Sequence, residues 1–491
     1  MAAREAWSEV NRQITQLFGL FALLFGLLVV FTSRWTVIEA HSLENKPSNR
    51  RALIQEQRVP RGVIYARDDK TVLAKSVPHG HGQSRIFSRT YPTGPLFSHA
   101  IGYSYILNGR RGLEQSRNDD LAGKQNEFAS ILSGLESRRT EGFDLVTNLD
   151  PAGQKTAIQA LGGQKGAVVA IEPATGKVRV MASVPGYDAN QIPSGFSRLN
   201  RDLNKPLFNR STQELYPPGS TFKVVTTTAA LDSGKFTPTS IINGKSPLVV
   251  SGAPLANDGG QSFGPITLTD ALTNSVNTVF AQVGERVGRS TLLKYMDRFG
   301  FNQKPKLDYP DDQMIRSGIR NGKGELVNGS TGFDIGRVAI GQGGLEGAIT
   351  VSPLQMAEVA AAVANGGRLM KPRLTDRIVG KDGRVKQRIA PDLQAQVMKP
   401  STSKQLGAMM SKVVEEGTAT AAALQGIRVA GKTGTAEVAN RTANQAWFIA
   451  FAPVDKPKIA IAVTIERTQG QGGTVAAPIA KQVLQVLLKQ K

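Results

Sequence analysis

Cysteine is absent from this 491-residue sequence, and histidine is scarce. Without cysteine the chain can form neither a disulfide nor a thiolate metal site, which suits an exported protein built without disulfides. The four histidines are His41, His79, His81 and His99. The long part after His99 therefore cannot build a Ser-His-Asp triad or a histidine-ligated metal site from its own residues. A serine enzyme located there has to activate its nucleophile with lysine.

Acidic residues are also few, 39 against 60 Lys and Arg, so the formal net charge is +21. Such a surface attracts nucleic acid, acidic lipids or anionic wall polymers, and charge alone does not choose among them. The content of hydrophobic residues (40%) and of charged residues (20%) is typical of folded globular proteins. The length predicts at least two domains.

A 21-residue stretch, 13–33, carries no charge and has the apolar centre "LFGLFALLFGLLVVF". At about 1.5 Å per residue a helix of this length spans roughly 30 Å, the thickness of a bilayer's hydrocarbon core. Trp7 and Trp35 flank it, as in an aromatic belt. A cleaved signal peptide and a buried core helix are the alternatives, but no small-x-small cleavage site follows Phe31. We predict a single membrane anchor. Basic residues on both sides leave its orientation open.

The remaining chain predicts an α+β protein. Residues 34–145 are expected to form an irregular, β-rich domain, here called the pedestal, and residues 146–491 a second domain. Paired strands are expected over 166–188 and again over 446–466, and helices over 221–234, 267–288, 352–367 and 477–488. This pattern places a helical group against an antiparallel sheet built from early and late strands.

The segment "YPPGSTFK", 216–223, places Ser220 at the start of a helix and Lys223 three residues later on the same face. A lysine can take the proton of a serine hydroxyl if burial or a nearby cation lowers its pKa. The alternative is that Ser220 only caps a helix and Lys223 is solvated.

A second candidate element is Ser275-Val276-Asn277. Residues two apart do not share a helix face, so we expect this triplet at a helix junction that points into a cleft. The hydroxyl could relay a proton, and the amide could bind a substrate carbonyl. Ordinary helix capping is the alternative.

The third element, Lys432-Thr433-Gly434-Thr435, lies in a segment that also matches the phosphate-loop pattern G-x-x-x-x-G-K-[ST] at 426–433. A phosphate loop requires a following helix and further strands, whereas a hairpin is predicted here and the chain soon ends. We therefore expect strand at 426–430 and a substrate-facing strand edge at 432–435. Lys432 would supply charge, Thr433 and Thr435 would bind a carboxylate, and Gly434 would let substrate approach closely.

Together, in this order, the three elements resemble those of penicillin-interacting serine enzymes. The chain resembles a class B penicillin-binding protein, a peptidoglycan DD-transpeptidase, of the short type found in actinobacteria. "RGVIYARDDKTVLA", 61–74, is similar to the family's N-terminal R-G-x-I-x-D-R-N-G box and departs from it at Ala66 and Asp68-Asp69-Lys70. "RTYPTGPLFSHAIGY", "GRRGLEQ", "AIGQGGLEGAITVSPLQMA" and "AWFIAFAP" match further family segments.

The resemblance implies a serine β-lactamase-like fold for 146–491, a dimerisation-type pedestal, and no metal or organic cofactor. Ser220 would attack the penultimate D-Ala of a stem ending in D-Ala-D-Ala, with Lys223 as base and the Ser220 and Thr435 N–H groups holding the oxyanion. Ser275 would protonate the leaving amine, and Asn277 would hold the stem. Lys432, Thr433 and Thr435 would bind the terminal carboxylate. β-Lactams should acylate Ser220.

The same resemblance implies the location and partners of the chain. Residues 1–12 would lie inside the cytoplasmic membrane and the catalytic domain outside it, with a SEDS-family glycosyltransferase of the RodA/FtsW type as partner and no nucleic acid. A DD-carboxypeptidase, a β-lactamase and a non-catalytic sensor or scaffold for wall peptides are the alternatives. A class A β-lactamase is disfavoured because no Glu-x-x-Leu-Asn stretch occurs between Asn277 and Lys432.

Overall fold

The computed structural model describes residues 2–38, 57–81, 84–123, 141–327, 329, 331–343, 347–438 and 442–489. The chain divides into two compact units, Met1–Arg58 and Val59–Lys491, which are described separately.

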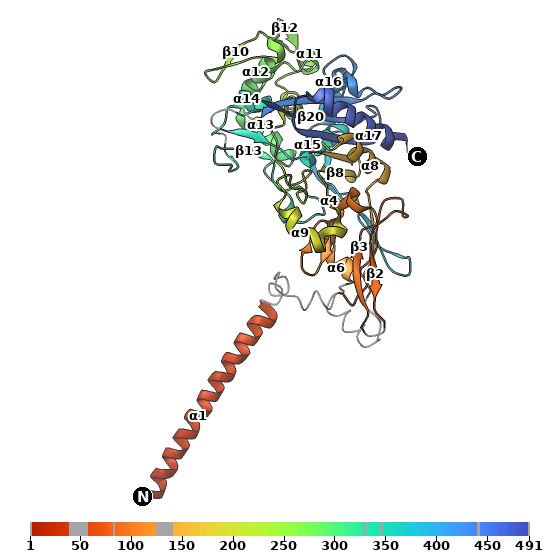
Figure 1. The fold of residues 1–491 in the computed structure, drawn as a ribbon. Coiled ribbons are helices and arrows are strands. Elements are labelled where there is room, and N and C mark those ends of the chain that lie inside the picture. The colour runs from red at the N-terminus through yellow and green to blue at the C-terminus, as the bar shows by residue number, and fades with distance from the viewer. Residues whose placement is uncertain are drawn as a thin grey trace. The chain divides into compact units, whose positions relative to one another are not determined.

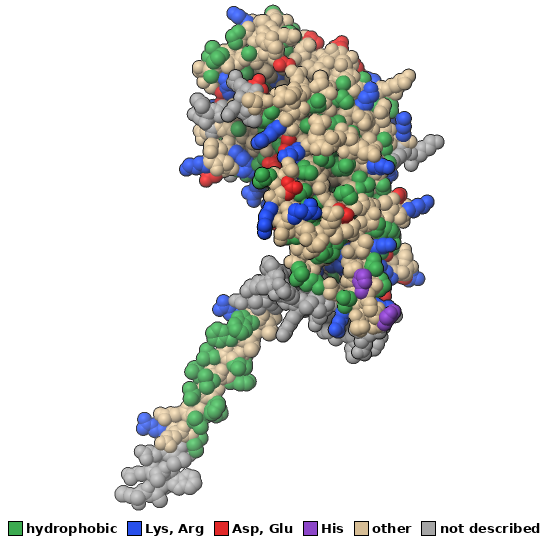
Figure 2. All heavy atoms as spheres, viewed as in Figure 1, with side chains coloured by type: hydrophobic (Ala, Val, Ile, Leu, Met, Phe, Trp, Pro, Cys, Tyr) green, Lys and Arg blue, Asp and Glu red, His purple; other side chains and the backbone are tan. Residues whose placement is uncertain are grey.

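In the first unit the structure describes one long helix. α1 (Ala2–Ser33) continues into a π-helical turn, η1 (Arg34–Ile38). Within it, Arg12–Thr36 has a mean hydropathy of 2.4 and is long and apolar enough to cross a membrane. Hydrophobic side chains cover this part of the helix, and its large apolar residues are exposed (Figure 2). The predicted anchor, 13–33, lies inside this span.

The second unit is built around a five-stranded sheet in which all neighbouring strands are antiparallel (Figure 1). In spatial order the strands are β19 (Ala430–Val438), β20 (Ala443–Ala452), β21 (Ile459–Thr468), β7 (Gly166–Glu172) and β8 (Lys177–Val184). Strands rich in Val, Ile, Ala and Phe form its buried centre, where both faces are covered. The prediction of an antiparallel sheet made from early and late strands is confirmed.

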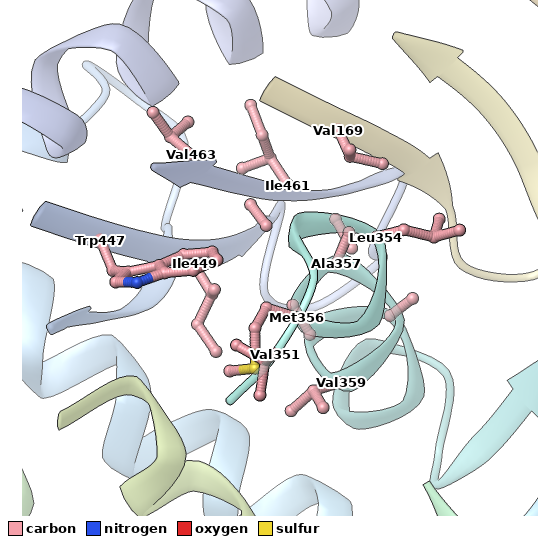
Figure 3. Close-up of a cluster of buried hydrophobic side chains, with 14 of the residues drawn as sticks. Val169, Val351, Leu354, Met356, Ala357, Val359, Trp447, Ile449, Ile461 and Val463 are labelled. Carbon is pink, nitrogen blue, oxygen red and sulfur yellow. The ribbon is translucent and has the colours of Figure 1, made fainter. Parts of the chain in front are cut away.

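Helix α15 (Pro353–Ala364) packs on one face of this sheet (Figure 3). By strand register Val169, Trp447 and Ile449 share that face, whereas Ile461 and Val463 belong to the opposite one. The helices α8 (Pro151–Leu161) and α17 (Ala477–Lys489) pack against each other and against β8 and β21. Each buried Leu, Ile or Met side chain stabilises such a core by about 1.5–3 kcal/mol.

The predicted helical group is present, and α10 is its central member. All ten residues of α10 (Lys223–Asp232) are buried. The other helices of the group are α11 (Leu268–Thr273), α12 (Asn277–Val287), α13 (Arg289–Arg298), α14 (Ile335–Ala339) and α16 (Pro400–Glu415). With the sheet they form the α+β fold expected from the sequence.

Residues 267–288 are helical, as their spacing predicts, and they contain the junction expected at the Ser275 triplet: α11 and α12 meet there, and the chain breaks at 274–276 with Ser275 at a left-handed φ of 57°. One local prediction is wrong. Residues 426–429 are not strand: Gly426 has a φ of 73° in a turn, and β19 begins only at Ala430. A turn in this position reverses the chain between α16 and the sheet edge.

The described part of the pedestal is β-rich, as predicted, and contributes strands to a six-stranded sheet. Its strands, in spatial order, are β17 (Val385–Arg388), β16 (Thr375–Val379), β6 (Asp144–Thr147), β1 (Ile64–Tyr65), β2 (Val72–His79) and β3 (Ile86–Thr90). Two strands therefore come from the C-terminal half, and β6 crosses the expected boundary at 145/146. That boundary remains a prediction.

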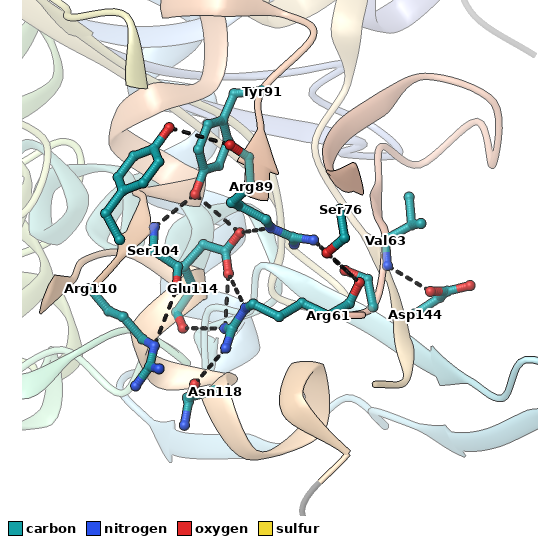
Figure 4. Close-up of polar contacts among 12 residues, drawn as sticks. Arg61, Val63, Ser76, Arg89, Tyr91, Ser104, Arg110, Glu114, Asn118 and Asp144 are labelled. Atoms are coloured by element: carbon teal, nitrogen blue, oxygen red, sulfur yellow. Dashed lines mark hydrogen bonds and ion pairs between the residues drawn. The ribbon is translucent and has the colours of Figure 1, made fainter. Parts of the chain in front are cut away.

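Glu114 anchors the interior of the pedestal (Figure 4). Its carboxylate is fully buried and accepts hydrogen bonds from Arg61 (2.9 Å) and Arg89 (2.5 Å). Burial raises the pKa of Glu114, but the charges of Arg89 and Arg61 outweigh burial and lower it overall. Removing Glu114 would take this carboxylate away from both guanidinium groups, so the cluster holds β3 and the segment before β1 to the short helix α5 (Leu113–Ser116).

The departure at Asp69 from the family's N-terminal box has a structural answer. Asp69 stands where the box has glycine and adopts a φ of 58°. The Asp68 carboxylate accepts from the backbone N–H groups of Lys70 (3.1 Å) and Thr71 (2.9 Å), which closes the turn. Asp69 also forms an ion pair with Arg377 of β16, which ties this turn to the added strand.

The remaining short elements connect these bodies. The two-stranded pairs are β4 (Ser104–Tyr105) with β5 (Gly109–Arg110), β9 (Ile241–Asn243) with β12 (Pro265–Thr267), β10 (Leu248–Val250) with β11 (Ala253–Leu255), β13 (Gly318–Arg320) with β14 (Ala348–Thr350), and β15 (Arg368–Met370) with β18 (Leu393–Gln396). The short helices are η3 (Gly94–Phe97), α4 (Ser98–Ile101), α6 (Asn118–Ala122), η4 (Ala189–Gln191), α9 (Ile192–Arg201), η5 (Gly219–Phe222), η6 (Asp258–Gly260), η7 (Asp311–Gln313), η8 (Thr420–Ala422) and η9 (Gly472–Ala476). Lys and Arg side chains are spread over the visible face of this unit rather than gathered in one patch (Figure 2).

Candidate active site

Ser220 lies in the 3-10 turn η5, which leads directly into α10, as predicted. Backbone hydrogen bonds hold the preceding loop. Tyr216 N donates to Val351 O (2.9 Å), Val351 N donates to Tyr216 O (2.8 Å), and Gly219 N donates to Gly341 O (3.0 Å). The indole N–H of buried Trp447 donates to Pro217 O at 2.9 Å. Among the described residues the Ser220 hydroxyl has no hydrogen-bond partner, so it is free to meet a ligand.

Lys223 is the first residue of α10 and is fully buried. Its Nζ lies 2.7 Å from Ser275 O, 2.7 Å from Asn277 Oδ1 and 3.3 Å from Ser275 Oγ. Burial lowers the pKa of Lys223 well below its usual value, and the nearby charge of Lys432 lowers it further, while Asp258 opposes both effects. The free base required of a serine activator is therefore favoured at this position.

Ser275 lies at the junction between α11 and α12, where the sequence placed it. Its left-handed φ of 57° is uncommon for a residue with a side chain. This conformation turns both its carbonyl and its hydroxyl toward Lys223. Asn277 begins α12, and its Nδ2 donates to Ala256 O at 3.1 Å.

Lys432 lies on β19 and is fully buried. Its Nζ is 2.9 Å from Ser275 Oγ and 3.0 Å from Thr433 O. Burial lowers the pKa of Lys432 to about 7. Ser275 Oγ thus lies between the two lysines. The structure brings together Lys223, Ser275, Asn277 and Lys432 from three separate parts of the sequence.

The remaining residues of the third motif also lie in β19, the edge strand of the sheet. Thr433 Oγ1 lies 2.6 Å from Thr418 Oγ1, and Thr435 Oγ1 accepts from Gly472 N at 3.2 Å. Gly434 approaches the turn that carries Ser220, since a Cβ there would lie 2.6 Å from Pro218 O. Close packing is thus one reason for this glycine, and the close approach of substrate stays a prediction.

The phosphate-loop interpretation of 426–433 has no structural support. Lys432 lies inside a strand, and a hairpin with β20 follows, so no helix N-terminus is present to bind phosphate. The described residues contain no group of three His, Cys, Asp or Glu side chains that could hold a metal ion.

Buried His99 bonds to Pro185 O at 3.1 Å, and burial lowers its pKa to about 4.

Sequence reasoning missed several residues around this site, among them Gly341, Trp447, Asp258 and Gln471. Their partners lie far away in the chain: Trp447, for example, reaches Pro217 across 230 positions. No spacing rule in one sequence indicates such a pairing.

Comparison with protein families gives two matches. Residues 166–485 match the penicillin binding protein transpeptidase domain, and residues 61–144 match the penicillin binding protein A dimerisation domain. The first match alone covers more than half of the chain.

Individual proteins agree with these matches. The chain is 32% identical to the peptidoglycan D,D-transpeptidase PbpA of Mycolicibacterium smegmatis, over 98% of this chain and 100% of that one. Penicillin-binding protein A from M. tuberculosis, solved as an imipenem acyl-enzyme complex, is 31% identical with a TM-score of 0.78, covering 89% and 100% of the two chains. The D,D-transpeptidase domain of a peptidoglycan glycosyltransferase from Eggerthella lenta is 31% identical, covers 88% and 99%, and has a TM-score of 0.77.

The family model over 166–485 and the relatives that cover nearly the whole chain together show the family: the chain belongs to the penicillin-binding protein family, as a class B D,D-transpeptidase of the actinobacterial-like type.

Proposed function

We propose that this D,D-transpeptidase forms its acyl-enzyme on Ser220 and cross-links peptidoglycan stem peptides that end in D-Ala-D-Ala. β-Lactams would acylate the same hydroxyl. One observation carries the assignment. Ser275 Oγ lies 2.9 Å from Lys432 Nζ and 3.3 Å from Lys223 Nζ, and Lys223 directly follows the turn that bears Ser220.

In the acylation step, Lys223 acts as the free base. It takes the proton of Ser220 Oγ as that oxygen bonds to the penultimate D-Ala carbonyl. The backbone N–H groups of Ser220 and Thr435 hold the resulting oxyanion. Strand geometry supports Thr435 in this role: its carbonyl is directed toward Gly219, and the N–H and C=O of one residue in an antiparallel strand point to the same side.

Collapse of the tetrahedral intermediate breaks the peptide bond. Ser275 gives its proton to the departing D-Ala nitrogen and regains one from Lys223. Lys432, with the Thr433 and Thr435 hydroxyls, binds the terminal carboxylate, and Asn277 holds the stem. An amine of a second stem then attacks the acyl ester, forms the new amide and returns a proton to Ser220 Oγ. No metal or organic cofactor takes part in this proposal.

The proposal includes a place for the chain in the cell. The apolar span Arg12–Thr36 anchors it in the cytoplasmic membrane, with residues 1–12 inside and the pedestal (34–145) and transpeptidase domain (146–491) outside, where the substrate lies. A SEDS-family glycosyltransferase of the RodA/FtsW type that polymerises the glycan is the proposed partner, and nucleic acid is not.

Labelling with the fluorescent penicillin Bocillin tests the nucleophile. Wild type should label, and Ser220→Ala should not. Equal labelling of both, or of neither, would refute Ser220. Thr221→Ala is a matched control one residue away, because the buried Thr221 hydroxyl bonds to Pro218 O and takes no part in the chemistry. Mass analysis of products from polymerised, lipid-linked substrate separates cross-linking from simple loss of D-Ala, the outcome expected of a carboxypeptidase.

A further inference from the structure

The loop 256–261, which follows β11, is fixed to the helix junction that carries Ser275. Asn277 Nδ2 donates to Ala256 O at 3.1 Å, and Thr278 N donates to Asn257 Oδ1 at 2.9 Å. Asn257 is itself buried. These contacts place the next residue, the exposed Asp258, beside the junction at a defined position.

A second loop, at the start of η9, approaches Asp258 from the side of β19. Gly472 N donates to Thr435 Oγ1 at 3.2 Å, which fixes this loop to the third motif. The neighbouring Gln471 places its Nε2 3.5 Å from Asp258 Oδ2. A separation at the upper limit of a hydrogen bond, between two exposed side chains, is easily replaced by a stronger donor.

The charge of Asp258 acts on the buried Lys223. Two buried lysines, Lys223 and Lys432, lie around one serine hydroxyl. Asp258 acts on Lys223 against both burial and the charge of Lys432. A cation that enters from outside meets the repulsion of these lysines unless a carboxylate compensates for it.

The second half of the proposed reaction needs such a cation, because the acceptor is a primary amine and is mostly an ammonium at neutral pH. We propose that Asp258 is the acceptor-recognition residue, which binds the ammonium of the incoming stem where Gln471 Nε2 now lies. This inference rests on the transpeptidase function proposed above.

Binding precedes chemistry and changes no bond. The ammonium then loses one proton to water, and the neutral nitrogen attacks the acyl ester on Ser220. The C–N bond forms as the C–O bond to Ser220 breaks, and the second nitrogen proton passes to Ser220 Oγ. Asp258 positions and concentrates the acceptor and is not itself part of the bond changes.

The test measures how the acyl-enzyme partitions between amine and water. Full-length enzyme is supplied with a soluble D-alanyl thioester donor and with one of two acceptors: D-alanine, which carries an ammonium, or hydroxylamine, which is uncharged at neutral pH. Asp258→Asn should reduce transfer to D-alanine relative to hydrolysis by about threefold to fivefold, the upper part of the range for an exposed charge pair. Transfer to hydroxylamine should stay within about twofold, and the wild-type preference for D-alanine should shrink as salt is raised.

Two further variants sharpen the result. Asp382→Asn removes an equally exposed carboxylate in the turn between β16 and β17 and should leave both partition ratios unchanged. Gln471→Ala removes the competing donor and should keep or raise transfer to D-alanine. A loss in Gln471→Ala as large as in Asp258→Asn would overturn the role of the carboxylate.

Equal losses with both acceptors, or no loss with either, would also overturn the inference. Bocillin acylation, measured for each enzyme at the pH where its rate is highest, serves as the fold check and should change less than twofold in Asp258→Asn. A fall in acylation with an unchanged partition would instead assign Asp258 to the donor stem and overturn the acceptor role. Failure of the proposed function is distinguishable, since wild type itself would then neither label nor transfer.

Discussion

Gly341→Ala should slow acylation of Ser220 although Gly341 is not part of any catalytic motif. Gly341 has a φ of 79°, and its carbonyl accepts the N–H of Gly219, the residue before the nucleophile, at 3.0 Å. A Cβ added at Gly341 would lie 1.8 Å from Gly219 O and 2.6 Å from Gly219 C. Both are backbone atoms, so no side-chain rotation can relieve the clash.

Two costs add up in this variant. A side chain in the left-handed region costs about 1–2 kcal/mol, and overpacking costs a further 1–3 kcal/mol or so. Gly324→Ala isolates the first cost, because Gly324 has a φ of 80° and a Cβ there meets nothing within 4 Å. The difference between the variants, about 1–3 kcal/mol, falls on the turn that holds Ser220. It corresponds to roughly a 5- to 100-fold slower acylation if the turn moves rather than the whole domain.

The second-order rate constant of Bocillin acylation and the thermal unfolding midpoint should be measured for both variants. We expect both to lower the midpoint and only Gly341→Ala to lower the acylation rate strongly. If Gly341→Ala acylates as fast as Gly324→Ala, the contact between residues 341 and 219 does not position the nucleophile, and the reasoning fails.

Three further variants test the charges of the site and the core. The wild-type acylation rate should fall as pH rises through about 7, because Lys432 then loses the charge that attracts a carboxylate. Lys432→Arg is always charged and should lack this fall. If the pH profile of Lys432→Arg equals that of wild type, the assignment is refuted. Asn277→Asp should raise the pKa of Lys223 by placing a negative charge 2.7 Å from its Nζ, so the acidic limb of the acylation profile should move up by about 1–3 pH units; a move to lower pH would contradict this. Burial raises the pKa of Glu358 to about 8, so its contribution to stability is complete below its unfolded pKa of about 4.5 and is lost as pH rises to 8. Glu358→Gln should therefore unfold at the same urea concentration as wild type near pH 5 and at a higher one near pH 9, and equal midpoints at both pH values would show that Glu358 is not buried neutral.

Patterns within short stretches of sequence predicted those parts of the fold that depend on residues close together in the chain. The strand pairs β7–β8 and β20–β21 follow from apolar runs separated by turn residues, and the two candidate lysines follow from short motifs. A junction at Ser275 is expected from the motif, but the left-handed conformation of Ser275 does not follow from the sequence, because 267–288 has helical spacing throughout. The left-handed conformation there is stabilised by contacts of Ser275 with Lys223 and Lys432, which lie far away in the chain.

The pedestal shows the same limit at the level of a sheet. No feature of 375–388 indicates that β16 and β17 pair with β6 rather than with the nearer strands of their own half. Asp69 is instructive, since the family box predicts glycine and the structure retains the glycine-like φ of 58°. Aspartate tolerates this conformation better than most residues, and its ion pair with Arg377 of β16 compensates for the rest. Aspartate in place of the box's glycine at position 69 and the added strand β16 are therefore linked by this ion pair.

Two lysines around one hydroxyl are unfavourable if both are charged, and this repulsion influences the protonation state of each lysine. Burial lowers the pKa of both lysines, and their charges repel each other, so one neutral and one charged lysine are favoured over two charged ones. In the proposed mechanism Lys223 is the neutral one and Lys432 the charged one. The site then holds a neutral base next to Ser220 and one charged lysine next to the expected carboxylate. After the first product leaves, that carboxylate is gone and the charge of Lys432 is no longer matched. The ammonium acceptor binds at this stage, when the positive potential of the site repels it most strongly. This repulsion is the physical reason to expect a carboxylate such as Asp258 where the acceptor enters the site.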